Sequence, residues 1–530
     1  MPDSAIGEEM STTRNKTVSH VPIRVLAANK SDSHQSLITS LRTSIPLAST
    51  EIHLVGEVIL NLYDTQDWKL SSNGYFVETQ SDPHNNIHFV LFSTDHPSSH
   101  FSIFDYSLFP NAIDLSTVKE VGVQRLLQRL ADGRSLVKMV SVSCYITEIE
   151  FSRHDTGLKL GKVRLITPKG LPEHWIEIEF AMGVNPTPTL KSIRRSLKAR
   201  LLSDTNWDRW ASTMRSSSRK RFDYNQLGRS TFEGNDSPIS ALKTIAMNIY
   251  QRVKLNSEGV AGDYDLEFCH EIRVDLRKMR VILEHLRHLS PANKDTKLDL
   301  CSLTKLEKGL KRFQAICGTQ RDLDVFITTL SEVESDSIEK TMEIKSQREK
   351  AHSLLLQFIE GGSLDELLGT WNHSLLCIEQ RFDVGVRIQK MSNFAYHRTS
   401  STYKDFMEQA KRTDAVASYE EMHNLRKKGK HLRYTLELFE PTFPPQTFKE
   451  AIKELKRTQD LLGAFQDAEV ALRLLDNLSS ISTAGLLIRE RMSDKRETLF
   501  GECLTQARQT LSNGGLNTID SLLKELNKRS

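Results

Sequence analysis

The sequence CHEIRVDLRKMR at residues 269–280 returns as MHNLRKKGKHLR at residues 422–433. In both copies a histidine stands second, and cations follow three, seven and ten positions after it. At about 100° per residue, these positions lie on one face of a helix. The matched pairs are His270 and His423, Arg273 and Arg426, Arg277 and Lys430, and Arg280 and Arg433. The repetition predicts two helices with the same basic face.

Each copy is followed by a second, related motif. Residues 318–325 read GTQRDLDV, and residues 463–470 read GAFQDAEV. From Ser237 to Leu526 apolar residues recur at three- and four-residue intervals, as in amphipathic helices, and the few prolines fall where helices should end. The sequence therefore predicts an all-α domain over residues 237–530, built from a duplicated helix pair with pseudo-two-fold symmetry.

The positive charge of this half is local. The whole chain has a net charge of only +3, with 26% charged and 38% hydrophobic residues, which is typical of a globular protein without a global positive field. A solvent-facing helix usually mixes signs so that residues four apart can pair, but these two faces carry cations alone. The second helices of the repeat add a further basic row: Lys308, Lys311 and Arg312 in the first copy, and Lys449, Lys453 and Lys456 in the second.

The basic faces have two interpretations. They could be solvated surfaces, which is the ordinary role of a charged helix face. Crowded like charges cost stability unless an anion neutralises them, however, and a flexible chain of phosphates suits arginine forks and lysine ammonium groups. The two histidines either contact phosphate, orient arginines or have a purely structural role. We expect Asp322, Asp324 and Asp467 to hold arginines or cap helices rather than to bind metal.

These motifs resemble the CHAD family, the conserved-histidine α-helical domain. The resemblance rests on the duplicated histidine and cation helix, on RDLDV at residues 321–325, and on Arg433-Tyr434 followed by QDLLG at residues 459–463. It implies antiparallel helical hairpins in two four-helix bundles, with a basic groove that binds inorganic polyphosphate. Together with the second row, the candidate binding residues are His270, Arg273, Arg277, Arg280, Lys311, Arg312, Arg321, His423, Arg426, Lys430, Arg433, Lys453 and Lys456.

Residues 21–210 favour strands. The alternating or β-rich runs are Val21–Ala27, Glu51–Tyr63, Ile87–Ser93, Lys138–Phe151, Lys162–Thr167 and His174–Phe180. Helical patterns interrupt them at Ser33–Thr43 and Ser116–Leu130. This order predicts an α+β domain with a largely antiparallel sheet. We expect a disordered segment before it, at residues 1–20, and a linker after it, at residues 211–236.

Two segments of this half resemble the CYTH family, whose triphosphate-tunnel fold often precedes a CHAD domain. Residues 62–74 resemble its Tyr-x-Asp-Thr-x-x-x-x-Leu-x-x-x-Gly segment, and residues 176–183 resemble its late acidic strand, with Glu177 and Glu179. The resemblance implies an antiparallel eight-stranded barrel whose tunnel holds triphosphate.

The chain departs from that family at the residues that carry its chemistry. The family opens with a strand Glu-x-Glu-x-Lys that holds a divalent metal, but residues 21–27 contain no carboxylate. Its Leu-Arg-x-Arg strand, which binds phosphate, is replaced by YFVETQ at residues 75–80. Hydrolysis in such a tunnel needs both groups. We therefore expect a degenerate barrel with no catalytic residues and no cofactor, in which Glu177 and Glu179 are weak metal candidates. Alternatively, they are solvated acids on an edge strand, as are Glu148 and Glu150.

The remaining features bear on location. The six cysteines are scattered without any CxxC pair, which favours a reducing compartment. We find no apolar run long enough to span a membrane and no signal-peptide core. These features predict a cytoplasmic protein without a membrane partner, and polyphosphate granules are one place where its ligand would be found.

The sequence thus predicts a protein that binds inorganic polyphosphate through its helical half and catalyses no reaction. One alternative is a metal-dependent inorganic triphosphatase with a rebuilt site, which would use Mg²⁺ or Mn²⁺. A second alternative is nucleic-acid or nucleotide binding, which is disfavoured because few aromatic residues interleave the basic faces for base stacking.

Overall fold

The computed structural model describes residues 23–29, 33–45, 48–81, 87–93, 99–101, 110–171, 173–181, 183–185, 187–197, 210, 214, 220, 222–228, 232–289, 300–333, 338–377, 389–478, 483–512 and 516–528. The predicted disordered residues 1–20 and much of the predicted linker lie outside the described residues. The chain forms two compact units, and the boundary between them lies between Gln226 and Leu227.

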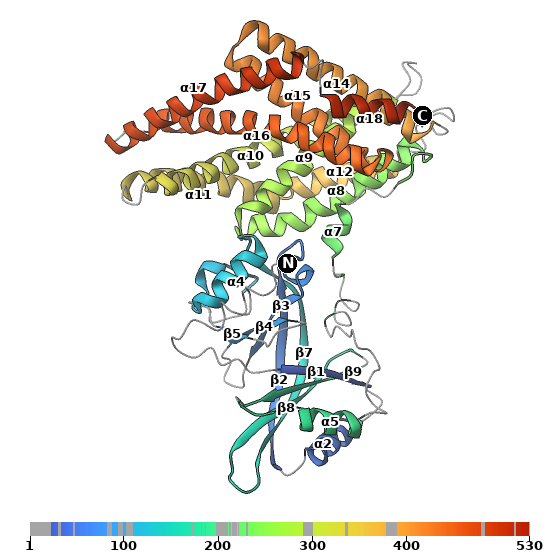
Figure 1. Cartoon of the computed structure of the whole chain (residues 1–530), viewed down its shortest axis with the longest axis vertical. Coiled ribbons are helices and arrows are strands. Elements are labelled where there is room, and N and C mark those ends of the chain that lie inside the picture. The colour runs from blue at the N-terminus through green and yellow to red at the C-terminus, as the bar shows by residue number, and fades with distance from the viewer. Residues whose placement is uncertain are drawn as a thin grey trace. The chain divides into compact units, whose positions relative to one another are not determined.

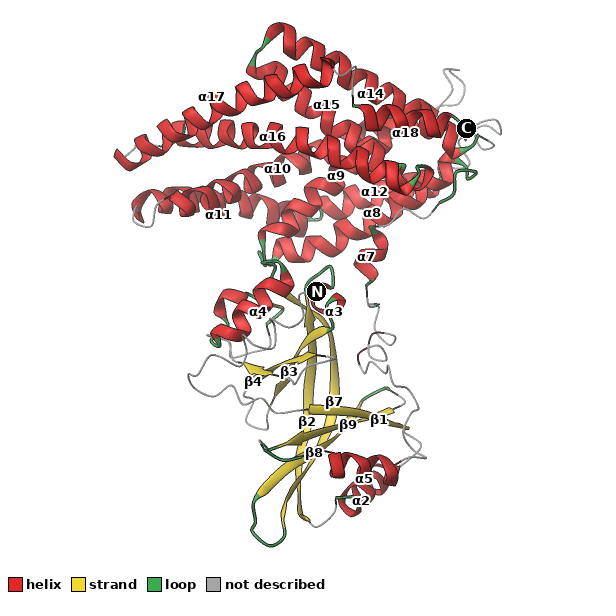
Figure 2. Cartoon of the chain, in the orientation of Figure 1, coloured by secondary structure: helices red, strands yellow, loops and turns green. Residues whose placement is uncertain are grey.

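The first unit contains one antiparallel sheet, curled into a half-barrel (Figures 1 and 2). Its strands are β1 (Ile23–Asn29), β2 (Ala48–Asp64), β3 (Tyr75–Ser81), β4 (Ile87–Ser93), β5 (Ser99–Phe101), β6 (Ala112–Ile113), β7 (Leu136–Arg153), β8 (Lys159–Pro168) and β9 (Glu173–Phe180). The strand order is β1-β9-β8-β7-β2-β3-β4-β5, and β6 pairs with β7. The prediction of an antiparallel sheet is confirmed. The implied closed barrel is not, because the outer strands β1 and β5 do not pair with each other within the described residues.

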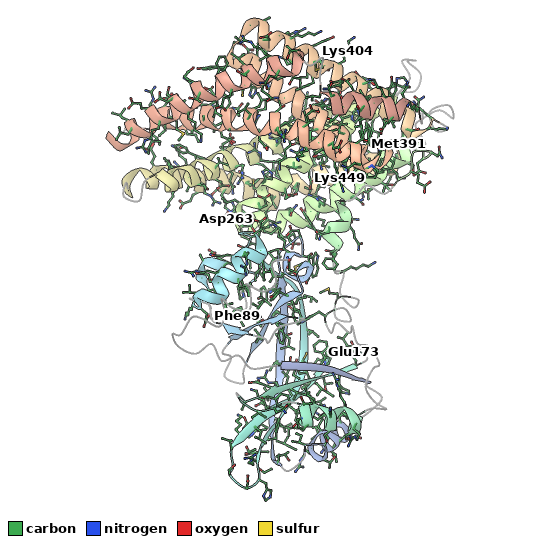
Figure 3. All side chains as sticks on the ribbon, viewed as in Figure 1. Phe89, Glu173, Asp263, Met391, Lys404 and Lys449 are labelled. Atoms are coloured by element: carbon green, nitrogen blue, oxygen red, sulfur yellow. The ribbon has the colours of Figure 1, made fainter. Side chains whose placement is uncertain are left out.

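Helices and buried side chains pack against this sheet in two separate cores. Helices α2 (His34–Thr43) and α5 (Thr187–Leu197) cover one face, where alternate residues of β7, β8 and β9 form a core. A second core contains Phe89, labelled in Figure 3, and packs against α4 (Val121–Ala131). The predicted helix at Ser33–Thr43 is confirmed as α2, while the pattern at Ser116–Leu130 divides into η1 (Leu115–Thr117) and α4. A short helix of this unit is α3 (Lys69–Ser72), and α7 (Asp223–Leu227) ends one residue beyond the boundary of the unit.

The described part of the second unit is helical (Figure 2). Its helices are α8 (Pro238–Ala261), α9 (Leu266–Leu289), α10 (Leu300–Val333), α11 (Ile338–Glu360), α12 (Ser363–Leu376), α14 (Met391–Val416), α15 (Tyr419–Leu438), η3 (Glu440–Thr442), α16 (Pro445–Asp476), α17 (Thr483–Ser512) and α18 (Asn517–Asn527). None of them is both long and apolar enough to cross a lipid bilayer. The two copies of the sequence repeat lie on α9 with α10 and on α15 with α16.

Local sequence explains where these helices begin. Pro238 stands in the first turn of α8, where its missing N–H is not needed, and Pro445 begins α16 in the same way. Ser418 caps α15 by accepting a hydrogen bond from the backbone N–H of Glu421, 3.2 Å away. Consecutive helices then pack side by side in each half, and contacts between α9 and α15 and between α10 and α16 join the halves.

Candidate functional site

The two repeated basic helices meet directly. Helix α9 contacts α15, and Arg277 Nη1 donates a hydrogen bond to the hydroxyl of Tyr434, 3.3 Å away. Tyr434 follows Arg433, the last cation of the second copy. The positive charges of Arg273 and Arg277 lower the pKa of both Arg426 and Lys430. The structure therefore brings the centres of the two basic faces into one cluster, formed by Arg273, Arg277, Arg426 and Lys430.

Matched contacts hold the last cation of each copy. Arg280 Nη1 donates to Gln314 Oε1 of α10 at 3.0 Å, and Arg433 Nη1 donates to Gln459 Oε1 of α16 at 3.3 Å. Gln314 and Gln459 occupy the same place in the repeat, four residues before its glycine. The duplication seen in the sequence is thus repeated in the side-chain contacts.

A second matched contact supports the helices behind the cluster. Arg348 Nε of α11 lies 2.9 Å from Asp324 on α10, and Arg496 Nη1 of α17 lies 3.0 Å from Glu469 on α16. Arg348 also pairs with Asp263, labelled in Figure 3, in the turn between α8 and α9. The expectation that Asp324 holds an arginine is met, but that arginine lies outside the sequence motif.

The first cation of the first copy is partly compensated. Arg273 Nη1 donates to the carbonyl oxygen of Gly318 at 3.1 Å and to Asp322 Oδ1 at 3.4 Å, so Asp322 holds an arginine as expected. The same face of α10 carries Arg321. Its charge lowers the pKa of His270 and of Asp467, which belongs to the other copy. Burial raises the pKa of Asp467. The charge of Asp467 raises the pKa of Arg426 and of Lys430, but within the described residues it makes no ion-pair contact with either.

Two cations of the second copy are half-buried, and no ion-pair partner of either lies among the described residues. Arg426 Nε is buried and has no hydrogen-bond partner among the described residues. Burial lowers the pKa of Arg426, and Arg277 adds to that effect. Burial also lowers the pKa of Lys430, from its ordinary 10.5 to about 7, with further lowering by Arg426, Arg277 and Arg273. A buried cation without a carboxylate is unfavourable, so this cluster is suited to receive an anion.

The two histidines of the motif are neutral at pH 7. Burial lowers the pKa of His270 to about 4, and the positive charge of Arg321 contributes to this lowering. Burial also lowers the pKa of His423, whose Nδ1 is hydrogen-bonded to Gln466 Oε1. Neutral imidazoles can donate or accept hydrogen bonds at the edge of the cluster, but they add no charge to it.

The second basic row has contacts of its own. Lys311 Nζ lies 2.7 Å from Glu307, its partner one turn earlier on α10. Arg312 lies over the ring of Phe358, 5.8 Å from its centroid, in a separate hollow between α10, α11 and α12. The structure thus places Arg312 against Phe358, and its membership of the groove stays a prediction. On α16, Lys453, Lys456 and Lys449 (labelled in Figure 3) are exposed.

Three acidic residues of the sheet, Glu148 on β7 and Glu177 and Glu179 on β9, are paired with cations. Arg164 Nη1 of β8 lies 3.6 Å from Glu177, and Arg164 Nε lies 2.9 Å from Glu148. Lys162 Nζ lies 3.5 Å from Glu179 and 3.3 Å from Glu148. Among the described residues, no group of three or more histidine, cysteine or acidic side chains is placed to hold a metal ion. Glu177 and Glu179 do not fit a metal site, because neighbouring cations already neutralise them.

The alternative interpretation of these acids also needs correction. Strand β9 is not an edge strand, since it pairs with β1 on one side and with β8 on the other. Glu177 is only 2% exposed, so it is not a solvated acid. Trp175 shares its face of the strand by alternation, and its ring lies 6.0 Å from that of the buried Trp210. The side chain of Trp210 thus covers part of the face that carries Glu177.

Sequence reasoning missed one buried polar cluster. His285 of α9 is fully buried, and its Nδ1 accepts a hydrogen bond from Arg398 Nε of α14 at 3.1 Å. Arg398 Nη2 also donates to Glu284 at 3.1 Å, and His431 Nε2 of α15 lies 2.8 Å from the same carboxylate. Residues 284 and 285 follow the first copy of the motif and His431 lies within the second copy, but Arg398 lies on another helix, so only the fold brings these groups together.

Comparison with known proteins gives one family. Residues 244–476 match the family described as the CHAD domain. A solved structure described as the CHAD domain from the plant Ricinus communis is 20% identical, with 56% of this chain and 95% of that one covered and a TM-score of 0.43. A structure described as a putative adenylate cyclase from Vibrio parahaemolyticus is 11% identical, with 35% and 94% covered and a TM-score of 0.23. None of the curated proteins matches the chain.

Proposed function

We propose that this chain, which carries a CHAD domain at residues 244–476, binds inorganic polyphosphate where α9 meets α15. The observation that carries the proposal is the partial burial of Arg426 and Lys430 beside Arg273 and Arg277, with no carboxylate within ion-pair distance of either among the described residues. Phosphate oxygens supply the missing negative charge and accept the unused guanidinium hydrogen bonds. The matched contacts of Arg280 with Gln314 and of Arg433 with Gln459 support a pseudo-two-fold arrangement of the two halves.

The first unit is proposed to lack triphosphatase activity. Its carboxylates at Glu148, Glu177 and Glu179 are engaged by Lys162 and Arg164, so they neither offer a free set of oxygen ligands to a divalent metal nor leave those cations free for phosphate. A polyphosphate-rich site in the cytoplasm, such as a granule, is the setting in which a binding protein of this kind would act.

The proposal is tested by titrating the full-length protein with sodium polyphosphate, tripolyphosphate and single-stranded DNA at several salt concentrations. Tightest binding to polyphosphate is expected, with an affinity that falls as salt rises because counterions are released from the chain. Preferred binding of the DNA would favour the nucleic-acid alternative. Loss of binding to all three anions at low salt would refute the proposal.

A further inference from the structure

The last cations of the two copies have the same sequence surroundings but different partners. Arg280 and Arg433 each stand four residues before a glutamate, Glu284 and Glu437 respectively. Residues four apart on a helix are neighbours, so both arginines can reach their glutamate. Both also donate to the equivalent glutamine of the next helix. The two arginines differ in how this glutamate is used.

In the second copy the glutamate neutralises the arginine. Arg433 Nε donates to Glu437 Oε1 at 2.6 Å, and Lys278 Nζ of α9 lies 3.0 Å from the other carboxylate oxygen. Burial raises the pKa of Glu437, but Lys278 and Arg433 lower it more, so the group is held ionised. An anion that approached Arg433 would have to compete with this carboxylate.

In the first copy the glutamate is turned to other partners. Glu284 is held by Arg398 Nη2 at 3.1 Å and lies 2.8 Å from His431 Nε2. The second contact of Arg398, with the buried His285, anchors it in the interior. As a result, Arg280 Nε is buried without a hydrogen-bond partner, and no carboxylate lies within ion-pair distance of Arg280 among the described residues.

We propose that the polyanion site is unequal at its two ends: Arg280 binds phosphate, Arg433 stays bound to Glu437, and Arg398 is a positioning residue that keeps Glu284 away from Arg280. This inference rests on the proposed function and adds a direction to it. The ligand extends from the central cluster along α9 rather than equally along both helices. Arg398 lies on α14 and influences the site through the carboxylate that it removes.

The repeat supplies its own matched control for a test. Arg280→Gln and Arg433→Gln change the same position of the motif in the full-length protein, and the affinity of each for sodium polyphosphate is measured across a range of salt. We expect Arg280→Gln to lose roughly ten- to a hundredfold in affinity, the range for a hydrogen bond to a charged group. Its salt slope should flatten by about 0.7 to 0.9, one lost contact. Arg433→Gln should lose less than about threefold.

The role of Arg398 is tested separately. Arg398→Gln should weaken binding towards the level of Arg280→Gln, because the released Glu284 turns to Arg280 as Glu437 does to Arg433. Adding Glu284→Gln to that variant should restore binding, which a merely structural defect of Arg398→Gln would not allow. Circular dichroism follows the fold of each variant, and the Arg280 and Arg433 pair decides the question of unequal ends if Arg398→Gln does not fold.

The outcomes separate this inference from the function on which it rests. Equal losses in Arg280→Gln and Arg433→Gln, with wild-type protein binding well, would overturn the unequal site and leave polyphosphate binding standing. A folded Arg398→Gln protein with wild-type affinity, or without rescue by Glu284→Gln, would overturn the positioning role. Absence of binding by the wild-type protein would overturn the proposed function and this inference together.

Discussion

Arg277 of the first repeated helix donates a hydrogen bond to the hydroxyl of Tyr434 on the second, across 3.3 Å. The contact joins residues that are 157 positions apart in the chain, and it lies between two basic faces that would otherwise repel each other. This aromatic hydroxyl is thus one link between the two copies, beside the pairs of Lys278 with Glu437 and of Glu284 with His431.

Binding of polyphosphate should depend on pH through Lys430. Its pKa of about 7 rises when an anion replaces part of its lost solvation, so binding takes up a proton above pH 7. Affinity should therefore be greatest below pH 7 and should fall as pH rises, by up to about tenfold per pH unit, until pH reaches the pKa of the bound form. Calorimetry in two buffers of different ionisation enthalpy measures the proton uptake.

Lys430→Arg is the control for this pH dependence. Arginine occupies the equivalent position of the first copy, as Arg277, and it stays charged over the whole pH range. The variant should bind polyphosphate with an affinity that is nearly constant between pH 7 and 9. The same pH dependence in this variant as in wild type would show that another group takes up the proton.

Residues 237–530 should fold and bind polyphosphate alone. All the cations of the cluster lie on helices of the second unit, which has its own internal contacts. Equal affinities of this fragment and of the full-length protein, measured by fluorescence anisotropy, are the expected result. A folded fragment without binding would mean that residues of the first unit belong to the site.

Arg164→Ala should destabilise the first unit strongly. It takes from Glu177, which is nearly fully buried, the cation that lies 3.6 Å away, and removal of one partner of a buried pair commonly costs about 3–5 kcal/mol. The lower end of this range is expected, because Arg164 is itself partly exposed. Urea unfolding measures the change, and adding Glu177→Gln should recover part of it. Lys169→Ala, which breaks an exposed pair with Glu57, is the control and should change little.

The full-length protein should release no phosphate from tripolyphosphate above background in Mg²⁺ or Mn²⁺. The cations and carboxylates that could serve such a reaction neutralise one another on β7, β8 and β9. A malachite-green assay with a Glu177→Gln/Glu179→Gln variant tests this directly. Metal-dependent release that the variant abolishes would promote the triphosphatase alternative.

The helical half illustrates what sequence alone can predict. The basic faces of α9 and α15 follow from helical spacing, which is a local property, and the duplication made their equivalence visible. Their meeting at Tyr434 depends on how the helices pack, and so does the choice of partner by Glu284. Nothing near Glu284 in the sequence indicates that Arg398, 114 positions later, takes its carboxylate.

The sheet also shows that contacts between distant segments cannot be predicted from local sequence. Alternation predicted most of the strands, including β4 over its full length, Ile87–Ser93. It could not show that β1 pairs with β9, because strand pairing joins distant segments. The interpretation of Glu177 as a solvated edge acid failed for this reason, and the contact of Trp210 with Trp175 was equally beyond local patterns.

The most direct test of polyphosphate binding at the α9–α15 cluster compares two charge-matched double variants of the full-length protein. Arg273→Gln/Arg426→Gln removes the first cation of each repeated face, whereas Lys404→Gln/Lys411→Gln removes two exposed cations of α14. The affinity for sodium polyphosphate is measured at one fixed salt concentration. The arginine variant should lose more than about a hundredfold and the lysine variant should bind like wild type. Equal affinities of the two variants would contradict the account, because the basic faces would then be ordinary solvated surfaces.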